Sequence, residues 1–155
     1  MNSMAKVRTA PVSFFPSLVG VLGGKTVLAA DVKSNLDMHR LIESGFPFRA
    51  LTEAAKAFRI PARIMADVVG IPRSTFDRRK RRKRLSADES ERVYRVAHVF
   101  ALALQAFDAS DNAADWIKRP NRALAGAQPI EMLRTEAGAR EVENVLGRVI
   151  YGGYS

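Results

Sequence analysis

The chain has 155 residues, of which 47% are hydrophobic, and a net charge of +9 at pH 7. A chain of this length forms one domain or two small ones, and this hydrophobic content excludes a mainly disordered protein. The absence of cysteine excludes disulfides, thiol catalysis and thiolate metal sites, and it fits a reducing compartment, so we expect a cytoplasmic protein.

The first 33 residues are interpreted as an N-terminal segment. Lys6 and Arg8 precede an apolar stretch, an order that resembles a secretory signal. Pro16 and Gly20 interrupt the stretch, so we predict a short helix over residues 13–22 after a tail. No apolar run in the chain reaches the roughly 18 residues of a membrane span, and we expect no membrane insertion.

Two amphipathic helices follow, over residues 34–44 and 48–58. Gly45 ends the first helix, because glycine is favoured just past a helix terminus. The second helix carries an apolar stripe at i, i+3, i+4 and i+7, which predicts a buried face. The stripe consists of Leu51, Ala54, Ala55 and Phe58.

The next segment reads as helix, turn, helix. Ile64, Met65 and Val68 recur at helical spacing and predict one apolar face. Gly70 suits a left-handed turn, and Pro72 suits the entry to a second helix because its φ is already helical. This layout is typical of a helix-turn-helix, whose second helix reads the DNA major groove.

The second helix and the residues after it form a basic run. Eight of residues 73–84 are Arg or Lys and one is acidic, giving the segment a net charge of +7. Phe76 is the one large apolar residue and should face inward.

We predict base contacts from the outward residues and phosphate contacts from the rest of the run. The base-contacting residues are Arg73, Ser74, Thr75, Arg78 and Arg79. The phosphate-contacting residues are Lys80, Arg81, Arg82, Lys83 and Arg84. The run alone would equally suit a localisation signal or an RNA-binding arm.

A long helix is predicted over residues 87–107. Ser86 and Glu89 have the spacing of a capping box at its start. Apolar residues cover more than one side of this helix, as expected for a helix buried between neighbours. It either joins the two halves of the chain or forms the seam of a dimer.

The remaining segment is predicted as short helices and a terminal helix. We expect helices over residues 111–118 and 129–135, with a break before Gly138 and a last helix over 139–150. No strand alternation is strong enough to predict a β-strand, so the chain is expected to be all-α.

Residues for catalysis are not apparent. The segment around Gly23-Gly24-Lys25 resembles a phosphate-binding loop, but Val19 stands where the loop needs its first glycine. His39 and His98 lie on separate helices without carboxylates at ligand spacing. We therefore expect a non-enzymatic protein with no cofactor and no metal.

Three segments together resemble the Xre/MbcA/ParS antitoxins: RSTFDRRKR, LSADESERVYRVA and WIKRPNRALAGAQPIEMLRTEAGAREVENVLGRVIYG. The resemblance spans about residues 41–152. It implies an Xre-like helix-turn-helix domain over residues 34–86. It further implies a connecting helix and a toxin-binding domain with a flexible C-terminal tail over residues 87–155.

The resemblance also implies partners: a RES-class toxin that consumes NAD⁺, and the operator DNA of the pair's own promoter. A homodimer within the toxin–antitoxin assembly would match a two-fold operator. The toxin-binding residues that the resemblance implies are Trp116, Pro120, Asn121, Leu124, Gly126, Tyr151, Gly152, Gly153, Tyr154 and Ser155.

The last residues suggest how a toxin could be blocked. Gly152-Gly153 lets the chain leave the helix in many directions, and Tyr154 with the Ser155 carboxylate could enter a nucleotide pocket. The alternative for these residues is a frayed terminus. The alternative for the whole protein is a stand-alone helix-turn-helix repressor without a toxin.

Overall fold

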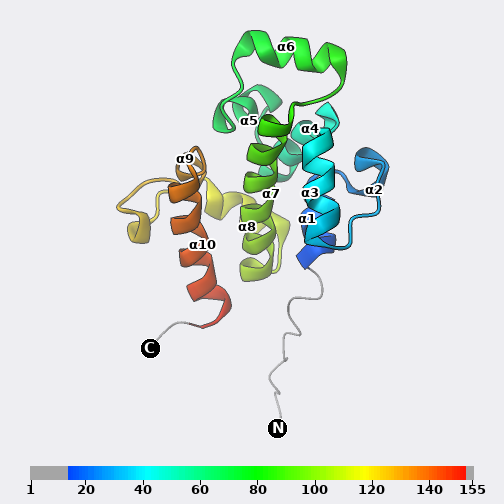
Figure 1. Ribbon diagram of the computed structural model, residues 1–155. Helices are drawn as coiled ribbons and strands as arrows, with labels where there is room; N and C mark the ends of the chain where they lie inside the picture. The colour runs from blue at the N-terminus through cyan, green and yellow to red at the C-terminus, as the bar shows by residue number, and fades with distance from the viewer. Residues whose placement is uncertain (1–13, 153–155) are drawn as a thin grey trace.

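The computed structural model describes residues 14–152, and these residues form helices and turns with no β-strand among them (Figure 1). The helices are α1 (Phe14–Val21), α2 (Gly24–Leu28), α3 (Asn35–Ser44), α4 (Phe48–Phe58), α5 (Ala62–Val68), α6 (Arg73–Arg82), α7 (Ala87–Phe107), α8 (Ser110–Ile117), the 3₁₀ turn η2 (Arg122–Leu124), α9 (Pro129–Met132) and α10 (Glu136–Ile150). The all-α prediction is therefore confirmed.

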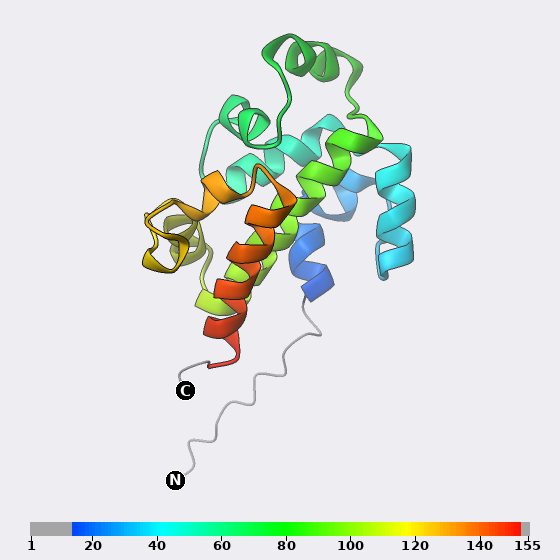
Figure 2. The same cartoon turned by 60° about the vertical axis from the view of Figure 1, so that its left-hand side comes forward.

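Helix α7 is the centre of the fold. It packs against α1, α3 and α4 on one side and against α8 and α10 on the other. Figure 2 shows α10 running alongside it. Val93, Val96, Val99 and Phe100 are at most 1% exposed, so the apolar sides of α7 are used within this chain. The width of the apolar surface of α7 is therefore explained by the chain's own core, and a dimer seam on this helix stays a prediction.

The N-terminal part adds a helix that the sequence pattern did not predict. Gly23 and Gly24 take φ values of +103° and +76°, and α2 starts there and buries Val27 and Leu28. Glycine tolerates these left-handed angles. The expected tail at residues 1–11 and a cap at Ser13 lie outside the described residues.

The last helix begins three residues earlier than predicted. The Thr135 side chain accepts a hydrogen bond from the Gly138 N–H at 3.0 Å, which places Gly138 in the first turn of α10. Gly138 is buried, and a Cβ added there would collide with the Met132 carbonyl. The glycine thus lets the end of α9 approach α10 closely and does not break a helix.

Candidate DNA-binding and toxin-binding surfaces

The helix-turn-helix consists of α5, a four-residue connection and α6. Gly70 takes a φ of +71°. The Ile71 N–H then donates to the Ala66 carbonyl at 2.8 Å, and the Ile71 side chain is 2% exposed between the helices. Met65 and Val68 are buried as predicted, whereas Ile64 is 45% exposed and does not belong to the inward face of α5.

Helix α6 stands at one end of the molecule, away from both ends of the described chain (Figure 1). Phe76 is its anchor: the ring is 4% exposed and packs edge-to-face on Phe48, with ring centroids 5.2 Å apart. The guanidinium of Arg63 lies 4.7 Å above the same ring, and Arg63 pairs with Asp77 at 2.9 Å. These contacts orient α6 on α4 and α5.

Arg79 joins α6 to the start of α7. Its Nε donates to Glu89 Oε1 at 2.7 Å, and Glu89 also completes the predicted capping box with Ser86. Burial by itself raises the pKa of Glu89. The hydrogen bonds from the Ser86 N–H and the Arg79 guanidinium outweigh that effect and hold this pKa below its ordinary value. Arg79, expected among the base-contacting residues, is thus held by the protein's own carboxylate.

The end of the basic run is bound to the turn between α3 and α4. Arg84 donates to the carbonyl of Gly45 at 2.7 Å. The Lys83 carbonyl accepts from the Phe48 N–H at 3.1 Å, and Leu85 N–H donates to the Phe46 carbonyl at 2.9 Å. The Arg84 guanidinium therefore satisfies helix-end carbonyls of α3, although it was expected on phosphate.

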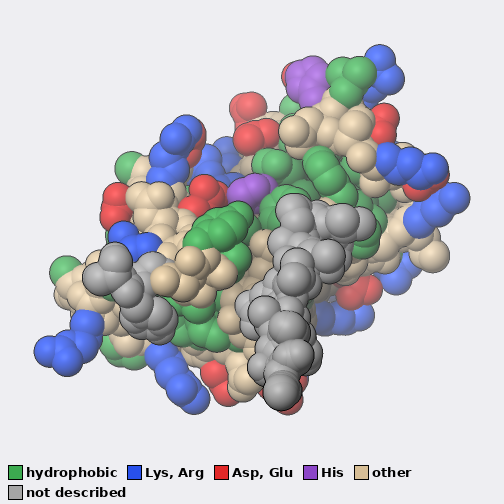
Figure 3. Space-filling view, turned by 90° about the horizontal axis from the view of Figure 1, so that it is seen from below, with side chains coloured by type: hydrophobic (Ala, Val, Ile, Leu, Met, Phe, Trp, Pro, Cys, Tyr) green, Lys and Arg blue, Asp and Glu red, His purple; other side chains and the backbone are tan. Residues whose placement is uncertain are grey.

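Six cations of the basic run remain exposed, and the structure gives their side chains no hydrogen bond or ion pair within residues 14–152. They are Arg73, Arg78, Lys80, Arg81, Arg82 and Lys83. Ser74 is exposed among them and Thr75 is half-buried. The face away from α6 differs, because there acidic and basic side chains are interspersed (Figure 3). The molecule thus presents an uncompensated positive end formed by α6.

The expected toxin-binding residues on α8 and η2 divide into exposed and structural ones. Trp116 is half-buried, with its ring centroid 5.4 Å from that of Phe107. Leu124 is only 6% exposed, so its side chain belongs to the core and does not face a partner. Asn121 caps η2 through its side chain, which accepts from the Ala123 N–H at 2.9 Å. Gly126 remains at the surface, as does Pro120.

The end of α10 carries exposed apolar residues. Tyr151 is 84% exposed and Val149 is 40% exposed. Gly152 has a φ of +65°, which turns the chain away from the helix. Figures 1 and 2 place this end of α10 at the far end of the helix from α9. Gly153, Tyr154 and Ser155 lie outside the described residues.

Polar contacts also connect the C-terminal half of the chain to α4 and α5, and sequence patterns did not reveal them. Arg134, just before α10, donates to the Asp67 carbonyl of α5 at 3.1 Å. Arg59, at the end of α4, forms an ion pair with Asp111 of α8. No spacing rule links residues this far apart in sequence, so the fold had to be known first.

Within residues 14–152, the structure contains no group of three or more His, Asp or Glu side chains that could hold a metal ion. None of the described helices combines the length and the apolar character that crossing a membrane requires.

Comparison with known proteins matches two adjacent parts of the chain to family models. Residues 37–98 match the antitoxin Xre-like helix-turn-helix domain. Residues 102–152 match the antitoxin Xre/MbcA/ParS C-terminal toxin-binding domain. The two matches meet within α7, the helix that packs against both halves.

Relatives with curated names agree with this division. The chain is 40% identical over 87 residues to the Antitoxin Xre of Photorhabdus laumondii, covering 55% of this chain and 59% of that protein. It is 32% identical over 116 residues to the Antitoxin Xre of Yersinia enterocolitica, covering 74% of this chain and 78% of that protein. It is 24% identical over 132 residues to the Prs ADP-ribosylating antitoxin of a Sphingobium species, covering 79% and 83%. With a helix-turn-helix half and a toxin-binding half joined through one central helix, the chain belongs to the Xre/MbcA/ParS family of antitoxins.

Proposed function

We propose that this chain neutralises a RES-class toxin that consumes NAD⁺ and, as a dimer, represses its own operon through the helix-turn-helix. Membership of the antitoxin family supports the toxin partner. One relative is named for ADP-ribosylation, a reaction that takes its ADP-ribose from NAD⁺, which supports a partner with NAD⁺ chemistry. The antitoxin itself acts by binding and not by catalysis.

The DNA-binding half of the proposal is carried by one observation: six exposed cations without internal partners surround the outward face of α6. Arg73, Ser74 and Arg78 are exposed in the first two turns, where a recognition helix meets base edges. Residues 80–83 come next in the chain, and we assign their side chains to the phosphates of the DNA backbone. Arg79 and Arg84 do not contact DNA in this proposal. They hold α6 in place through Glu89 and the end of α3.

The test for DNA binding is the salt dependence of affinity for the chain's own promoter and for random DNA. If the four cations of residues 80–83 each neutralise one phosphate, log K should fall against log salt concentration with a slope of about −4 for each bound subunit. Arg78→Ala should reduce the preference for promoter DNA, whereas Lys80→Ala should weaken both DNAs equally and make the slope shallower. Equal effects of both substitutions on both DNAs would contradict base reading by α6.

The toxin-binding half of the proposal uses the exposed end of α10 and the surface near Trp116. Tyr151 and Val149 offer exposed apolar side chains at this end of α10, and buried aromatic side chains often anchor protein interfaces. Pro120 and Gly126 extend the surface at η2. Residues 153–155 continue from Gly152, and we propose that they reach the toxin's NAD⁺ site and block it.

Co-expression with the product of the neighbouring gene, followed by co-purification and an NAD⁺ consumption assay, tests this half. Deletion of residues 153–155 should restore NAD⁺ consumption while the complex still forms, because Tyr151 and Trp116 remain. Full neutralisation by the shortened chain would contradict active-site entry. If no toxin co-purifies while the promoter is still repressed, the chain is a stand-alone repressor instead.

A further inference from the structure

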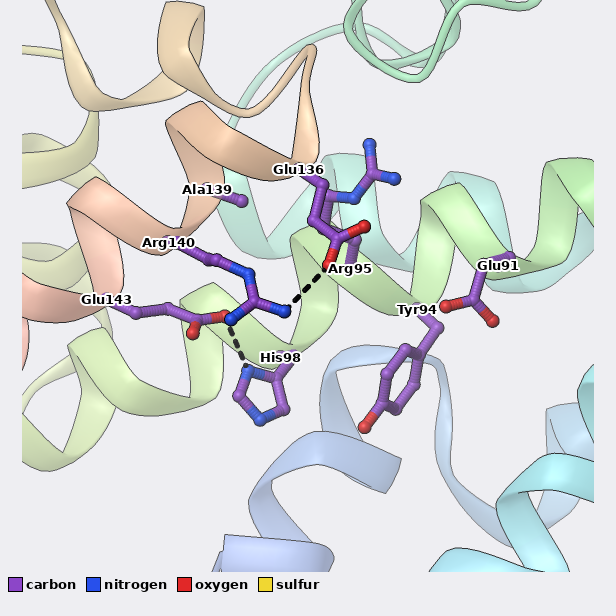
Figure 4. Close-up of a pocket in the computed structure, with 8 residues that line it drawn as sticks. All are labelled: Glu91, Tyr94, Arg95, His98, Glu136, Ala139, Arg140 and Glu143. Carbon is purple, nitrogen blue, oxygen red and sulfur yellow. Dashed lines mark hydrogen bonds and ion pairs between the residues drawn. The ribbon is translucent and has the colours of Figure 1, made fainter.

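A cleft between α7 and α10 is lined by charged side chains that neither proposed surface uses (Figure 4). Its volume is about 230 Å³. Tyr94 and His98 project into it from α7, and Arg140 and Glu143 border it on α10. An inference from this cleft is independent of DNA and toxin binding.

The cleft has the opposite charge to the rest of the molecule. With His98 neutral, its three carboxylates exceed its two guanidinium groups, although the whole chain has a net charge of +9. Arg140 is already paired with Glu136 at 2.9 Å. The pKa of Tyr94 is raised mainly by burial, and the charges of Glu91 and Glu143 raise it further.

The carboxylates of the cleft share few cations among the described residues. Glu143 contacts His98 Nδ1 at 3.2 Å, and the guanidinium nearest to it, that of Arg140, is already hydrogen-bonded to Glu136. Glu91 is exposed and forms no ion pair with another residue in the range 14–152. A basic segment bound beside them would give Glu91 its first ion pair and Glu143 a cation that it does not share with Glu136.

The N-terminal segment of this chain starts at the edge of the cleft. Phe14, the first residue of α1, has its ring centroid 5.0 Å from that of His98. The 13 residues before Phe14 contain Lys6 and Arg8 and no acidic residue. Arg8 lies six residues before Phe14, a distance of at most about 20 Å when extended, which is enough to cross between two packed helices.

The geometry disfavours DNA as the partner of this segment. Helix α1 begins at the end of the molecule away from α6, so the segment starts far from the positive surface that faces DNA (Figure 1). We propose that residues 1–13 bind in cis across the cleft between α7 and α10, with Lys6 and Arg8 against Glu91 and Glu143.

Zero-length carbodiimide cross-linking of the full chain tests the contact directly. The coupling joins a lysine amine to a carboxylate only when they touch, so Lys6 should link to Glu91 or Glu143. Lys6→Arg retains the charge but removes the reactive amine, and should abolish these products. A mixture of ¹⁴N- and ¹⁵N-labelled protein shows whether both linked peptides come from one molecule.

Trypsin cleavage after Arg8 provides a second measurement. Glu143→Lys should speed this cleavage about threefold to tenfold, as expected for losing and reversing an exposed ion pair, and high salt should do the same. Glu91→Lys should act alike, and it does not disturb His98. Glu141→Lys is the matched control, because Glu141 is exposed on α10 and does not line the cleft.

The outcomes separate cleanly when the thermal unfolding midpoints of the variants stay near that of the parent. Same-molecule links together with faster cleavage in the two cleft variants support binding in cis. Links between differently labelled molecules would overturn it in favour of exchange between copies. Links that avoid the cleft, or cleavage rates that match the Glu141→Lys control, would overturn it as well.

Discussion

Glu89 Oε1 accepts hydrogen bonds from Arg79 Nε at 2.7 Å and from the Ser86 N–H at 2.8 Å, so a single oxygen both caps α7 and holds α6. Glu89→Ala removes the cap and leaves the partly buried Arg79 without its counter-ion. We expect the free energy of unfolding to fall by about 2–4 kcal/mol in urea titrations. Asp88→Ala, an exposed change in the same helical turn, should cost well under half of that. Equal losses would show that Glu89 acts only through the helix dipole.

The same carboxylate predicts an acid-dependent loss of stability. Because the folded protein holds the pKa of Glu89 below its ordinary value of 4.5, folding is favoured by the ionised form. This contribution is fully present above about pH 4.5 and is lost as the pH falls through the folded pKa. The gap in urea midpoint between the parent and Glu89→Gln should therefore be widest near neutral pH and shrink on acidification. A gap that stays constant down to pH 3 would contradict the linkage.

Arg78 and Arg79 are neighbours with different predicted roles. Arg78 is exposed and has no partner within residues 14–152, so Arg78→Ala should lower promoter affinity by about 1–3 kcal/mol with little change in stability. Arg79→Ala should lower the stability itself, because it leaves the buried Glu89 unpaired. Fluorescence anisotropy with promoter DNA and urea unfolding of both variants separate the two effects. If the Arg79→Ala variant unfolded at the same urea concentration as the parent, the structural role assigned to Arg79 would be wrong.

Leu124 and Tyr151 provide the same kind of contrast in the toxin-binding half. Leu124→Ala should destabilise the fold by about 2–5 kcal/mol, because it opens a cavity in the core. Tyr151→Ala should leave stability nearly unchanged, since the side chain is 84% exposed, but should weaken toxin capture. Thermal unfolding and a pull-down with the co-expressed toxin measure both. Unchanged capture by Tyr151→Ala would remove the end of α10 from the proposed interface.

The sequence by itself determined the local elements of this protein. Helices α4 and α7 have the predicted bounds, and the Ser86–Glu89 capping box is present. These features depend on residues at most a few turns apart, so spacing and side-chain chemistry suffice to predict them. The family resemblance also rested on contiguous motifs, and the family comparisons confirm it.

Only the tertiary structure decided which contacts the apolar and charged side chains of these elements form. Periodicity showed that α7 is apolar on several sides, but not that α1, α3, α4, α8 and α10 are the helices that pack against it. Composition showed eight cations in one run, but not that Arg79 meets Glu89 and Arg84 meets Gly45. Long charged side chains find partners through space, and the partner of a surface arginine is fixed only when distant helices pack together.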